Sequence, residues 1–390
     1  MFVPDETSGK RGKTMEERLK REFEWLHTHP ELSYEEVQTT AYIRDALVQA
    51  GIRILPYALE TGLVAEITGA KPGACIALRA DIDALPVAEE SGVPYASAYA
   101  GKMHACGHDF HTAVLLEAAR RLYARRDTLA GTVRLIFQPG EESSSGALKI
   151  LATPALDGVQ AVFALHAWPF FPAGTVAVRP GAASASVDRF EITVTGKGTH
   201  AAAPQAGIDP IVIAAEIVTA AQTVVSRRLS PLSAALVSIT HVEAGNTWNV
   251  IPGTAYLEGT VRTLEPQDRQ AIPQHLAALA QGIAAAHGGS AEFLWHKGPP
   301  ATANDAAWTE FAADVARGTG LPAQLDPQNL LGEDFAFYQE KVPGVYTHFG
   351  VGSPAALHNP RFTADEAALS PAACYMAALA AAALEKLKKT

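Results

Sequence analysis

The sequence predicts an α/β protein in which a mainly parallel-sheet core carries an inserted ferredoxin-like domain. Helical segments and short apolar segments alternate over the first half of the chain. From about residue 186 the order changes to βαββαβ, and the alternation then resumes. Alternating strands and helices are typical of a layered fold around a parallel sheet, whereas βαββαβ is the order of the ferredoxin-like unit.

The first half of the chain supplies the elements of the parallel sheet. Amphipathic patterns predict helices near residues 15–27, 35–50 and 109–125. Apolar runs predict strands near residues 62–68, 74–79, 132–137 and 161–165. Polar side chains directly follow several of these strands: Asp81, Glu141, Glu142 and His166. Because ligands gather beyond the carboxyl ends of parallel strands, we expect one edge of the sheet to present these side chains together.

The inserted domain is predicted to span residues 186–295, which leaves a discontinuous first domain of residues 1–185 and 296–390. The predicted elements of the insert are a strand at 189–195, a helix at 209–226, strands at 235–242 and 254–263, a helix at 267–286 and a strand at 290–295. Gly298-Pro299-Pro300 marks the return to the first domain. An Ala-rich segment at the C-terminus is interpreted as a packing helix.

Composition and charge exclude several classes of partner. The 390 residues are 48% hydrophobic and 18% charged, which is enough for a large core in two or three domains. A net charge of -10 without a long Lys/Arg run disfavours nucleic-acid binding, because that function needs a basic surface. The longest apolar run, residues 372–384, is shorter than the roughly 20 residues that span a bilayer, so we expect no membrane partner.

The cellular compartment is predicted from the N-terminus and the cysteines. No basic segment followed by an apolar stretch begins the chain, so we expect no secretory signal. Cys75, Cys106 and Cys374 are an odd number at wide spacings, which does not fit a disulfide framework. A reducing, cytoplasmic location is therefore expected.

The strongest chemical signal is the segment Met-His-Ala-Cys-Gly-His-Asp-Phe-His at residues 103–111. It places Cys106 and His108 two residues apart where a loop enters a helix, and both are metal ligands. The pair alone is a weak signal, because a buried thiol beside a helix start capped by Asp109 gives the same pattern.

Further ligand types later in the chain strengthen the prediction of a metal site. Glu141 and Glu142 are adjacent carboxylates, which repel each other unless a cation or a shared proton holds them. His166 ends an apolar strand, and His358 precedes Asn-Pro in a turn. Each of these residues has a structural alternative: a solvated acidic loop, a core histidine or an exposed loop histidine. Thiolate, imidazole and carboxylate together suit zinc, with manganese, cobalt and nickel as alternatives.

Taken together, these segments resemble the M20 metallopeptidase family, in its amidohydrolase branch of N-acyl-L-amino-acid amidohydrolases (aminoacylases) and hippurate hydrolases. The resemblance covers nearly the whole chain. The six motifs that carry it, in the family's order, are residues 29–33, 78–86, 103–111, 138–142, 196–204 and 358–360.

The resemblance implies a two-metal site and a role for each matching residue. The implied metal ligands are Cys106, His108, Glu142, His166 and His358. Glu141 matches the general base, and Asp83 matches an acidic residue that orients a metal-binding histidine. The inserted domain resembles the family's lid and dimerisation domain, from which His200 would stabilise the oxyanion in the partner subunit's active site. Asn249 and Arg262 match positions that bind the substrate carboxylate.

The implied activity is metal-dependent hydrolysis of the amide bond of N-acyl-L-amino acids, such as hippurate or N-acetyl amino acids. Two metal ions would activate a water molecule, and Glu141 would carry its proton to the leaving amine. Trp168 and Phe170-Phe171 are candidates for lining an acyl pocket. The implied assembly is a homodimer, or a homotetramer if dimers pair, with a lid that closes over the substrate.

Three other functions compete with this prediction. An N-acetyl-diaminopimelate deacetylase or a dipeptidase of the same family would use the same site. A cysteine nucleophile, Cys106 paired with His104, His108 or His111, would leave Glu141-Glu142, His166 and His358 unexplained. A non-catalytic, metal-dependent binding scaffold would bind metal and ligand without turnover, and the presence of Glu141 argues against it.

Overall fold

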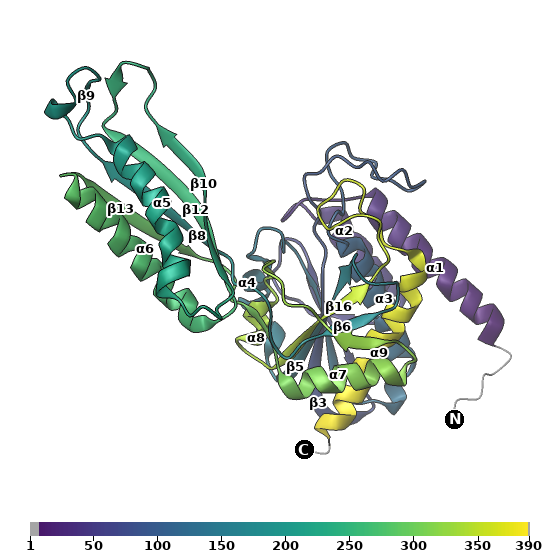
Figure 1. Ribbon diagram of the computed structural model, residues 1–390. Coiled ribbons are helices and arrows are strands. Elements are labelled where there is room, and N and C mark those ends of the chain that lie inside the picture. The colour runs from purple at the N-terminus through teal and green to yellow at the C-terminus, as the bar shows by residue number, and fades with distance from the viewer. Residues whose placement is uncertain (1–7, 389–390) are drawn as a thin grey trace. The chain divides into compact units, whose positions relative to one another are not determined.

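The computed structural model describes residues 8–388 and forms two compact units (Figure 1). Unit 1 consists of residues 1–181, 303–327 and 337–390, and unit 2 consists of residues 182–302 and 328–336. The sequence analysis placed the insert at 186–295 and did not include the later segment. That segment joins unit 2 because its backbone bonds to the beginning of the unit: Ala185 N–H donates to Leu331 O at 2.9 Å, and Asn329 N–H donates to Ala183 O at 3.2 Å.

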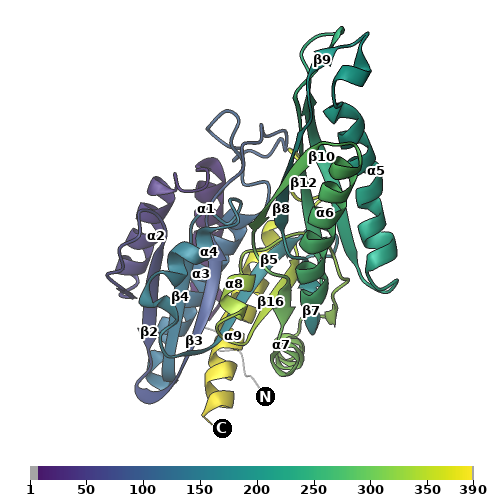
Figure 2. The same ribbon diagram turned by 90° about the vertical axis from the view of Figure 1, so that its left-hand side faces the viewer.

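The described part of unit 1 contains a mixed sheet of eight strands. Their order is β1 (Arg53–Ile54), β2 (Leu63–Thr68), β4 (Ala130–Gln138), β3 (Lys71–Asp81), β5 (Val159–Trp168), β16 (Gly344–Gly350), β6 (Val176–Val178) and β15 (Ala323–Leu325). The four central strands β4, β3, β5 and β16 are parallel, and Figure 2 shows them side by side. Near-continuous burial of these strands matches a parallel sheet that is covered on both faces.

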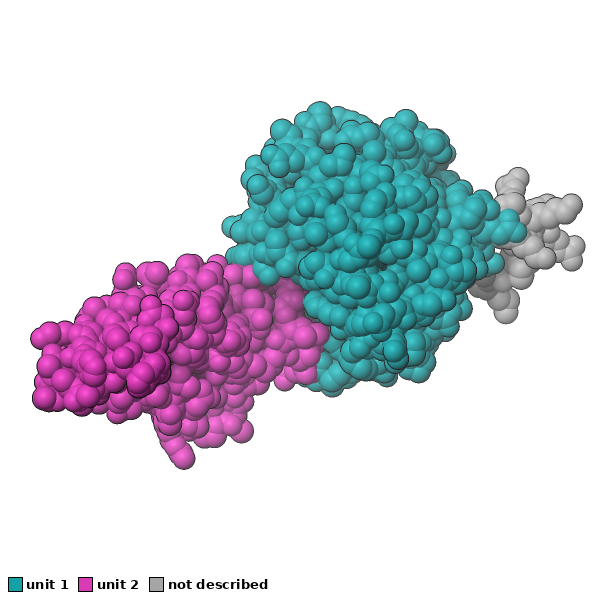
Figure 3. Space-filling view, turned by 90° about the horizontal axis from the view of Figure 1, so that it is seen from above, with its two compact units in different colours: residues 1–181, 303–327, 337–390 teal, residues 182–302, 328–336 magenta. Residues whose placement is uncertain are grey.

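Unit 2, coloured magenta in Figure 3, has the predicted βαββαβ order. Its elements are β8 (Asp188–Thr195), α5 (Pro210–Arg228), β10 (Ala235–Ala244), β12 (Thr254–Thr263), α6 (Pro266–Ala286) and β13 (Ser290–Lys297). The sheet order β10-β12-β8-β13 is antiparallel throughout, which is the ferredoxin-like arrangement. The predicted fold class, an α/β core with a ferredoxin-like insert, is confirmed.

Shorter elements complete the chain. In unit 2, β9 (Thr199–His200) pairs with β11 (Val250–Ile251) as a two-stranded ribbon, and the 3₁₀ helix η3 (Pro204–Ala206) follows β9. β7 (Gly181–Ser184) and β14 (Thr302–Asn304) lie where the chain passes between the units. The other helices of unit 1 are α2 (Val37–Gln49), η1 (Arg126–Thr128), α4 (Gly146–Leu151), η2 (Pro154–Leu156) and η4 (Glu366–Ala368). Helix α8 (Ala336–Gln339) begins at the last residue of unit 2 and continues into unit 1.

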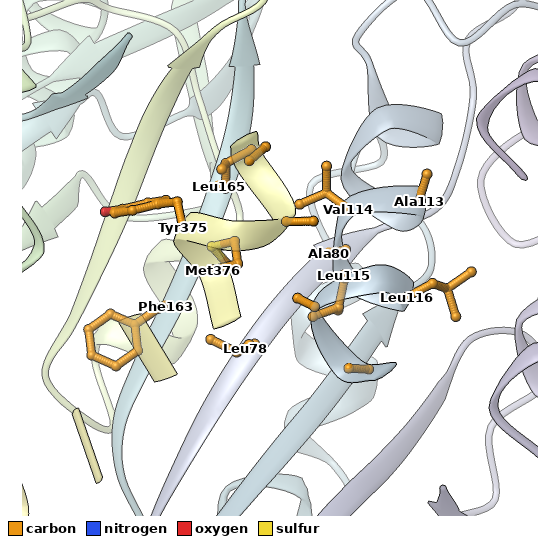
Figure 4. Close-up of a cluster of buried hydrophobic side chains, with 14 of the residues drawn as sticks. Leu78, Ala80, Ala113, Val114, Leu115, Leu116, Phe163, Leu165, Tyr375 and Met376 are labelled. Carbon is orange, nitrogen blue, oxygen red and sulfur yellow. The ribbon is translucent and has the colours of Figure 1, made fainter. Parts of the chain in front are cut away.

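A layer of helices covers the sheet of unit 1. Within this layer each helix packs against the next, in the order α1 (Ser8–Thr28), α3 (His108–Ala124), α9 (Leu369–Leu387) and α7 (Ala306–Gly318). Figure 4 shows the core between them: Leu115 of α3 and Met376 of α9 lie over Leu78 of β3, and all three are buried. This packing places the beginning of α3 at the carboxyl end of the parallel strands.

Within residues 8–388, two helices are long and apolar enough to cross a membrane by length and composition alone, namely α5 and the segment Glu366–Leu387. About half of that second segment is buried inside the protein, where α9 packs against α3 and β3. A core helix of a soluble protein passes the same test, so the two helices carry little weight as evidence for a membrane span.

A buried ion pair connects α1 to the beginning of α3. His27 Nδ1 lies 2.6 Å from Asp109 Oδ2, and His27 Nε2 lies 3.1 Å from Glu89 Oε1. Glu89 also accepts the backbone N–H of Ser97, so the same histidine anchors the loop that precedes α3. Burial by itself would lower the pKa of His27, but the hydrogen bonds and charges of Asp109 and Glu89 outweigh it and raise this pKa to about 10. A protonated His27 therefore ties these three segments together.

We predict that His27→Gln lowers the free energy of unfolding by about 3–5 kcal/mol in mildly acidic solution, because it leaves two buried carboxylates without their cation. The folded-state pKa lies above the ordinary value of 6.5, so the stabilisation is fully present below pH 6.5 and is lost as the pH rises through about 10. Urea denaturation across this pH range measures the difference between wild type and variant, which should shrink as the pH increases.

His287→Gln is the matched control, because His287 pairs with Glu216 at 3.1 Å on the surface, where both side chains are at least 36% exposed. This variant should stay close to wild type at every pH, since exposed pairs contribute roughly 0–1 kcal/mol. A stability difference for His27→Gln that does not change with pH would contradict the assignment.

Candidate metal centre

The turn before α3 brings Cys106 against the end of β5. Gly107 has a φ of 85°, and a Cβ at this position would lie 2.8 Å from the Cβ of Ala167, so the turn requires glycine. As a result, Cys106 Sγ lies 3.5 Å from His166 Nε2. Both residues are buried, and they come from segments about sixty residues apart in the sequence.

Asp83 holds the loop that carries the two glutamates. Its Oδ1 accepts the backbone N–H of Glu141 and its Oδ2 accepts that of Glu142, both at 3.0 Å. Ser33 Oγ donates a further bond to the same carboxylate at 2.7 Å. The preceding Gly140 donates its N–H to Glu36 Oε1 at 2.8 Å. The glutamate backbone is therefore fixed from two sides.

Two imidazoles are oriented by carbonyl oxygens. His108 Nδ1 donates to the carbonyl oxygen of Asp83 at 2.9 Å, and His166 Nδ1 donates to that of Ala167 at 2.8 Å. A carbonyl oxygen can only accept, so each ring carries a proton on Nδ1 and presents Nε2 to the other donor atoms. Metal-binding histidines in proteins are held in the same way. Asp83 Oδ1 also lies 3.3 Å from His108 Nδ1, close to the orienting role that the resemblance implies.

His358 completes the group from a loop. Its φ is 62°, and its backbone N–H donates to the carbonyl oxygen of Ala105, the residue before Cys106, at 2.8 Å. The side chain is half exposed, with Nε2 at 3.4 Å from Glu142 Oε1. His358 thus reaches the centre through a backbone bond to the same turn that holds the cysteine.

The predicted ligands and Glu141 form three overlapping groups, in each of which the donor atoms lie within 4.8 Å of one another. The groups are Cys106, His108 and His166; Cys106, Glu142 and His358; and His108, Glu141 and Glu142. The structure therefore brings together, at the carboxyl edge of the sheet, all five residues for which the sequence analysis gave a ligand role and the glutamate beside them.

The chemistry of this group fits divalent cations. His108 Nε2 and Glu142 Oε1 are buried without a hydrogen-bond partner in the described part of the chain. Burial and then the charges of Glu142 and Glu141 raise the pKa of the Cys106 thiol well above its usual value. Burial opposes protonation of His108, yet Asp81 and Asp83 raise its pKa to about 10. Buried negative charge contributes to both shifts, and a metal ion would balance it.

The same environment disfavours a cysteine nucleophile. A reactive cysteine needs a lowered pKa, whereas burial and the surrounding carboxylates raise the pKa of Cys106. The imidazole within hydrogen-bond range of the thiol is His166, which is not one of the partners considered for that mechanism. His111 uses both ring nitrogens elsewhere, on Asp81 and on the backbone of Ala167.

The substrate-binding candidates belong to unit 2 and do not form one group there. His200 and Asn249 lie together at the β9–β11 ribbon, where His200 is exposed, Asn249 is half-buried and the N–H of Ala201 donates to Asn249 O at 3.0 Å. Arg262 is near the other end of β12, eight residues beyond Thr254, which corresponds to roughly 26 Å at about 3.3 Å per residue. Its Nη1 is buried and has no hydrogen-bond partner among the described residues.

The sequence analysis did not identify a buried histidine–aspartate pair that lies near His166. His348 of β16 is in register with His166 of β5, and its Nδ1 lies 2.8 Å from Asp326 Oδ2. Trp168, a candidate for the acyl pocket, stacks on the His348 ring with centroids 4.0 Å apart. Phe170, named with it, is 67% exposed. His348 was missed because β16, the strand that carries it, was not predicted.

The sequence is similar to a known protein family and to two deacetylases. Residues 77–382 match Peptidase family M20/M25/M40. The N-acetylcysteine deacetylase of Bacillus subtilis (strain 168) is 49% identical over 364 residues, which are 93% of this chain and 96% of that protein. An N-acetyl-L-cysteine deacetylase of the same organism is 46% identical over 364 residues, which are 93% of this chain and 87% of that protein.

A solved structure agrees with these sequence matches. The Bacillus subtilis YXEP protein, described as a dinuclear metal binding peptidase from the M20 family, has a TM-score of 0.88 and 46% identity to this chain. The match covers 96% of this chain and 99% of that one. The resemblance stated from the sequence motifs is confirmed, and the chain belongs to peptidase family M20/M25/M40.

Proposed function

We propose that the protein hydrolyses the amide bond of N-acetyl-L-cysteine and related small N-acyl-L-amino acids, releasing a carboxylic acid and a free amino acid. The observation that carries this proposal is the cluster of thiol, imidazole and carboxylate donors around Glu141. The names of the two Bacillus subtilis deacetylases support the choice of acetyl group and amino acid.

We infer that two divalent metal ions bind at this cluster, zinc or manganese, with cobalt and nickel as alternatives. Cys106, His108, Glu142, His166 and His358 would hold them. When bound, the ions supply Lewis acidity, which polarises an amide carbonyl and lowers the pKa of water. The choice between these metals rests on ligand type alone, because thiolate and imidazole favour zinc whereas carboxylates also suit manganese.

The residues of the chain supply proton transfer and substrate binding. Glu141, whose backbone Asp83 holds in place, would take a proton from water and pass it to the leaving amine. His200 would donate a hydrogen bond to the oxyanion. Asn249 and Arg262 would bind the substrate carboxylate, for which the unpaired Nη1 of Arg262 offers a donor.

A homodimer is part of the proposal. His200 and Asn249 are separated from Arg262 within one unit 2 by roughly 26 Å of extended strand, which is longer than an N-acyl amino acid. One substrate molecule could contact both sets only if they came from different copies of the chain. A homotetramer would require a second contact between dimers. A cytoplasmic location is proposed because three widely spaced cysteines fit a reducing compartment. The net charge of -10 and the short apolar runs support the absence of nucleic-acid and membrane partners.

We predict that the purified protein releases free amino acid from N-acetyl-L-cysteine, and more slowly from benzoyl-glycine. A chelator should abolish the reaction and added manganese or zinc should restore it, because the cluster needs its cations. Free amine release from a panel of N-acyl amino acids, an N-acetyl-diaminopimelate and a dipeptide measures the preference. Turnover that persists in the presence of a chelator would contradict a metal-dependent mechanism. Metal binding without cleavage of any panel member would favour a non-catalytic binding scaffold.

We predict that Glu141→Gln lowers kcat by about 10²–10⁴-fold, the usual contribution of a positioned acid–base group, while the protein still binds its metals. Steady-state kinetics and metal content of the same preparation test both parts. Glu385→Gln is the control, because Glu385 is an exposed glutamate of α9 that pairs with Lys388 at 3.8 Å and belongs to none of the donor groups. A near-wild-type rate for Glu141→Gln would exclude Glu141 as the general base.

A further inference from the structure

His111 forms two hydrogen bonds that lead in opposite directions from α3. Its Nδ1 lies 2.5 Å from Asp81 Oδ1, and its Nε2 accepts the backbone N–H of Ala167 at 2.7 Å. His111 is one helical turn after His108, and Ala167 directly follows His166. All of these residues are buried. One side chain thus connects the helix that begins beside Cys106 to the strand end that carries His166.

The N–H of Ala167 needs this acceptor. Strand β5 continues to Trp168, but its pairing with β3 ends at Ala164, opposite Arg79. Strand β16 still pairs with β5 at this point, but Val162 N–H and Trp168 O are the groups bonded on that side. Because alternate residues of a strand face alternate neighbours, the N–H of Ala167 faces β3, which no longer supplies a carbonyl oxygen there, and a buried N–H must find another partner. Because an N–H can only donate, Nε2 of His111 must be unprotonated and its proton must reside on Nδ1, where it is donated to Asp81.

Asp81 is itself held by the sheet. Arg79 Nη1 donates to Asp81 Oδ2 at 2.6 Å, and Arg79 Nε donates to Gln138 Oε1 at 2.9 Å. Arg79 and Asp81 lie on β3, and Gln138 ends β4. The series of bonds therefore runs from β4 through β3 and α3 to the end of β5, entirely within unit 1.

We propose that His111 is a positioning residue, which sets the spacing between the donor atoms of Cys106 and His108 on one side and His166 on the other. A metal ion requires its ligands within a few tenths of an ångström of their ideal distances, so a shift of the β5 end would weaken binding. The inference rests on the metal centre of the proposed function, but it does not depend on which substrate is cleaved.

Two amide substitutions separate the two hydrogen bonds. In His111→Gln the side-chain amide ends near the position of Nε2, so its oxygen can still accept the N–H of Ala167. In His111→Asn the amide ends near Nδ1, so it can donate to Asp81 but leaves the Ala167 N–H without an acceptor. The metal-free proteins are titrated with zinc against a chromophoric chelator, and their melting temperatures check that each variant is folded.

We expect His111→Asn to bind zinc about 10–100-fold more weakly, as is typical when a partner of a metal-binding residue is lost. His111→Gln should retain the wild-type affinity. Wild-type affinity in His111→Asn, or equal weakening in both variants, would overturn the proposal, because the acceptor for Ala167 would then not control the site. A wild-type protein that binds no zinc would contradict the proposed function and this inference together.

A measurement on the wild-type protein covers the case in which His111→Asn does not fold. The nitrogen chemical shifts of the His111 ring, assigned by their loss in His111→Gln, report which nitrogen carries the proton. The proposal requires a protonated Nδ1 and an unprotonated Nε2 in the metal-free protein. A proton on Nε2 would overturn it, since the ring could then not accept the N–H of Ala167.

Discussion

Buried negative charge at the carboxyl edge of the unit 1 sheet is the constraint on which the site depends. Asp81 and Asp83 are fully buried, and Glu141 is 9% exposed. Carboxylates are costly to bury unless they are paired or coordinate a metal. The protein pairs the carboxylates beneath the site, as Arg79 does for Asp81, and leaves Glu142 Oε1 without a hydrogen-bond partner among the described residues. The negative charge that the protein leaves unpaired at the site is therefore available to bind a cation.

Hydrogen bonds to the backbone hold the side chains of the site in position. Asp83 accepts the N–H groups of both glutamates, and His108 and His166 donate to main-chain carbonyl oxygens. These bonds fix ligand orientation without using any donor atom that a metal needs. They also make the positions of the ligand side chains depend on short segments after β3, β4 and β5. Because these three strands belong to one parallel sheet, the sheet sets the relative positions of the ligands. Metal binding in turn would stabilise this frame by balancing its charge.

The sequence predicted the central strands and the metal ligands because each requires particular residue types that can be recognised in the sequence. Apolar runs identified β2 to β5, and a thiol, imidazoles and paired carboxylates identified the ligands. Strand β16 was missed because His348 and Thr347 interrupt its apolar pattern. The segment 328–336 was missed because its place in unit 2 rests on backbone bonds, which residue type does not reveal.

The bonds of Asp83 to the glutamate backbone and the role of His111 were beyond sequence reasoning for a related reason. Asp83 binds the backbone of residues that follow it by nearly sixty positions, and His111 binds the N–H of an alanine. Neither partner has a side chain that could signal the contact. A histidine within a metal-binding motif is naturally interpreted as a ligand or a base. Here both nitrogens of His111 are already hydrogen-bonded within the protein, so it acts by holding α3 and β5 at a fixed distance.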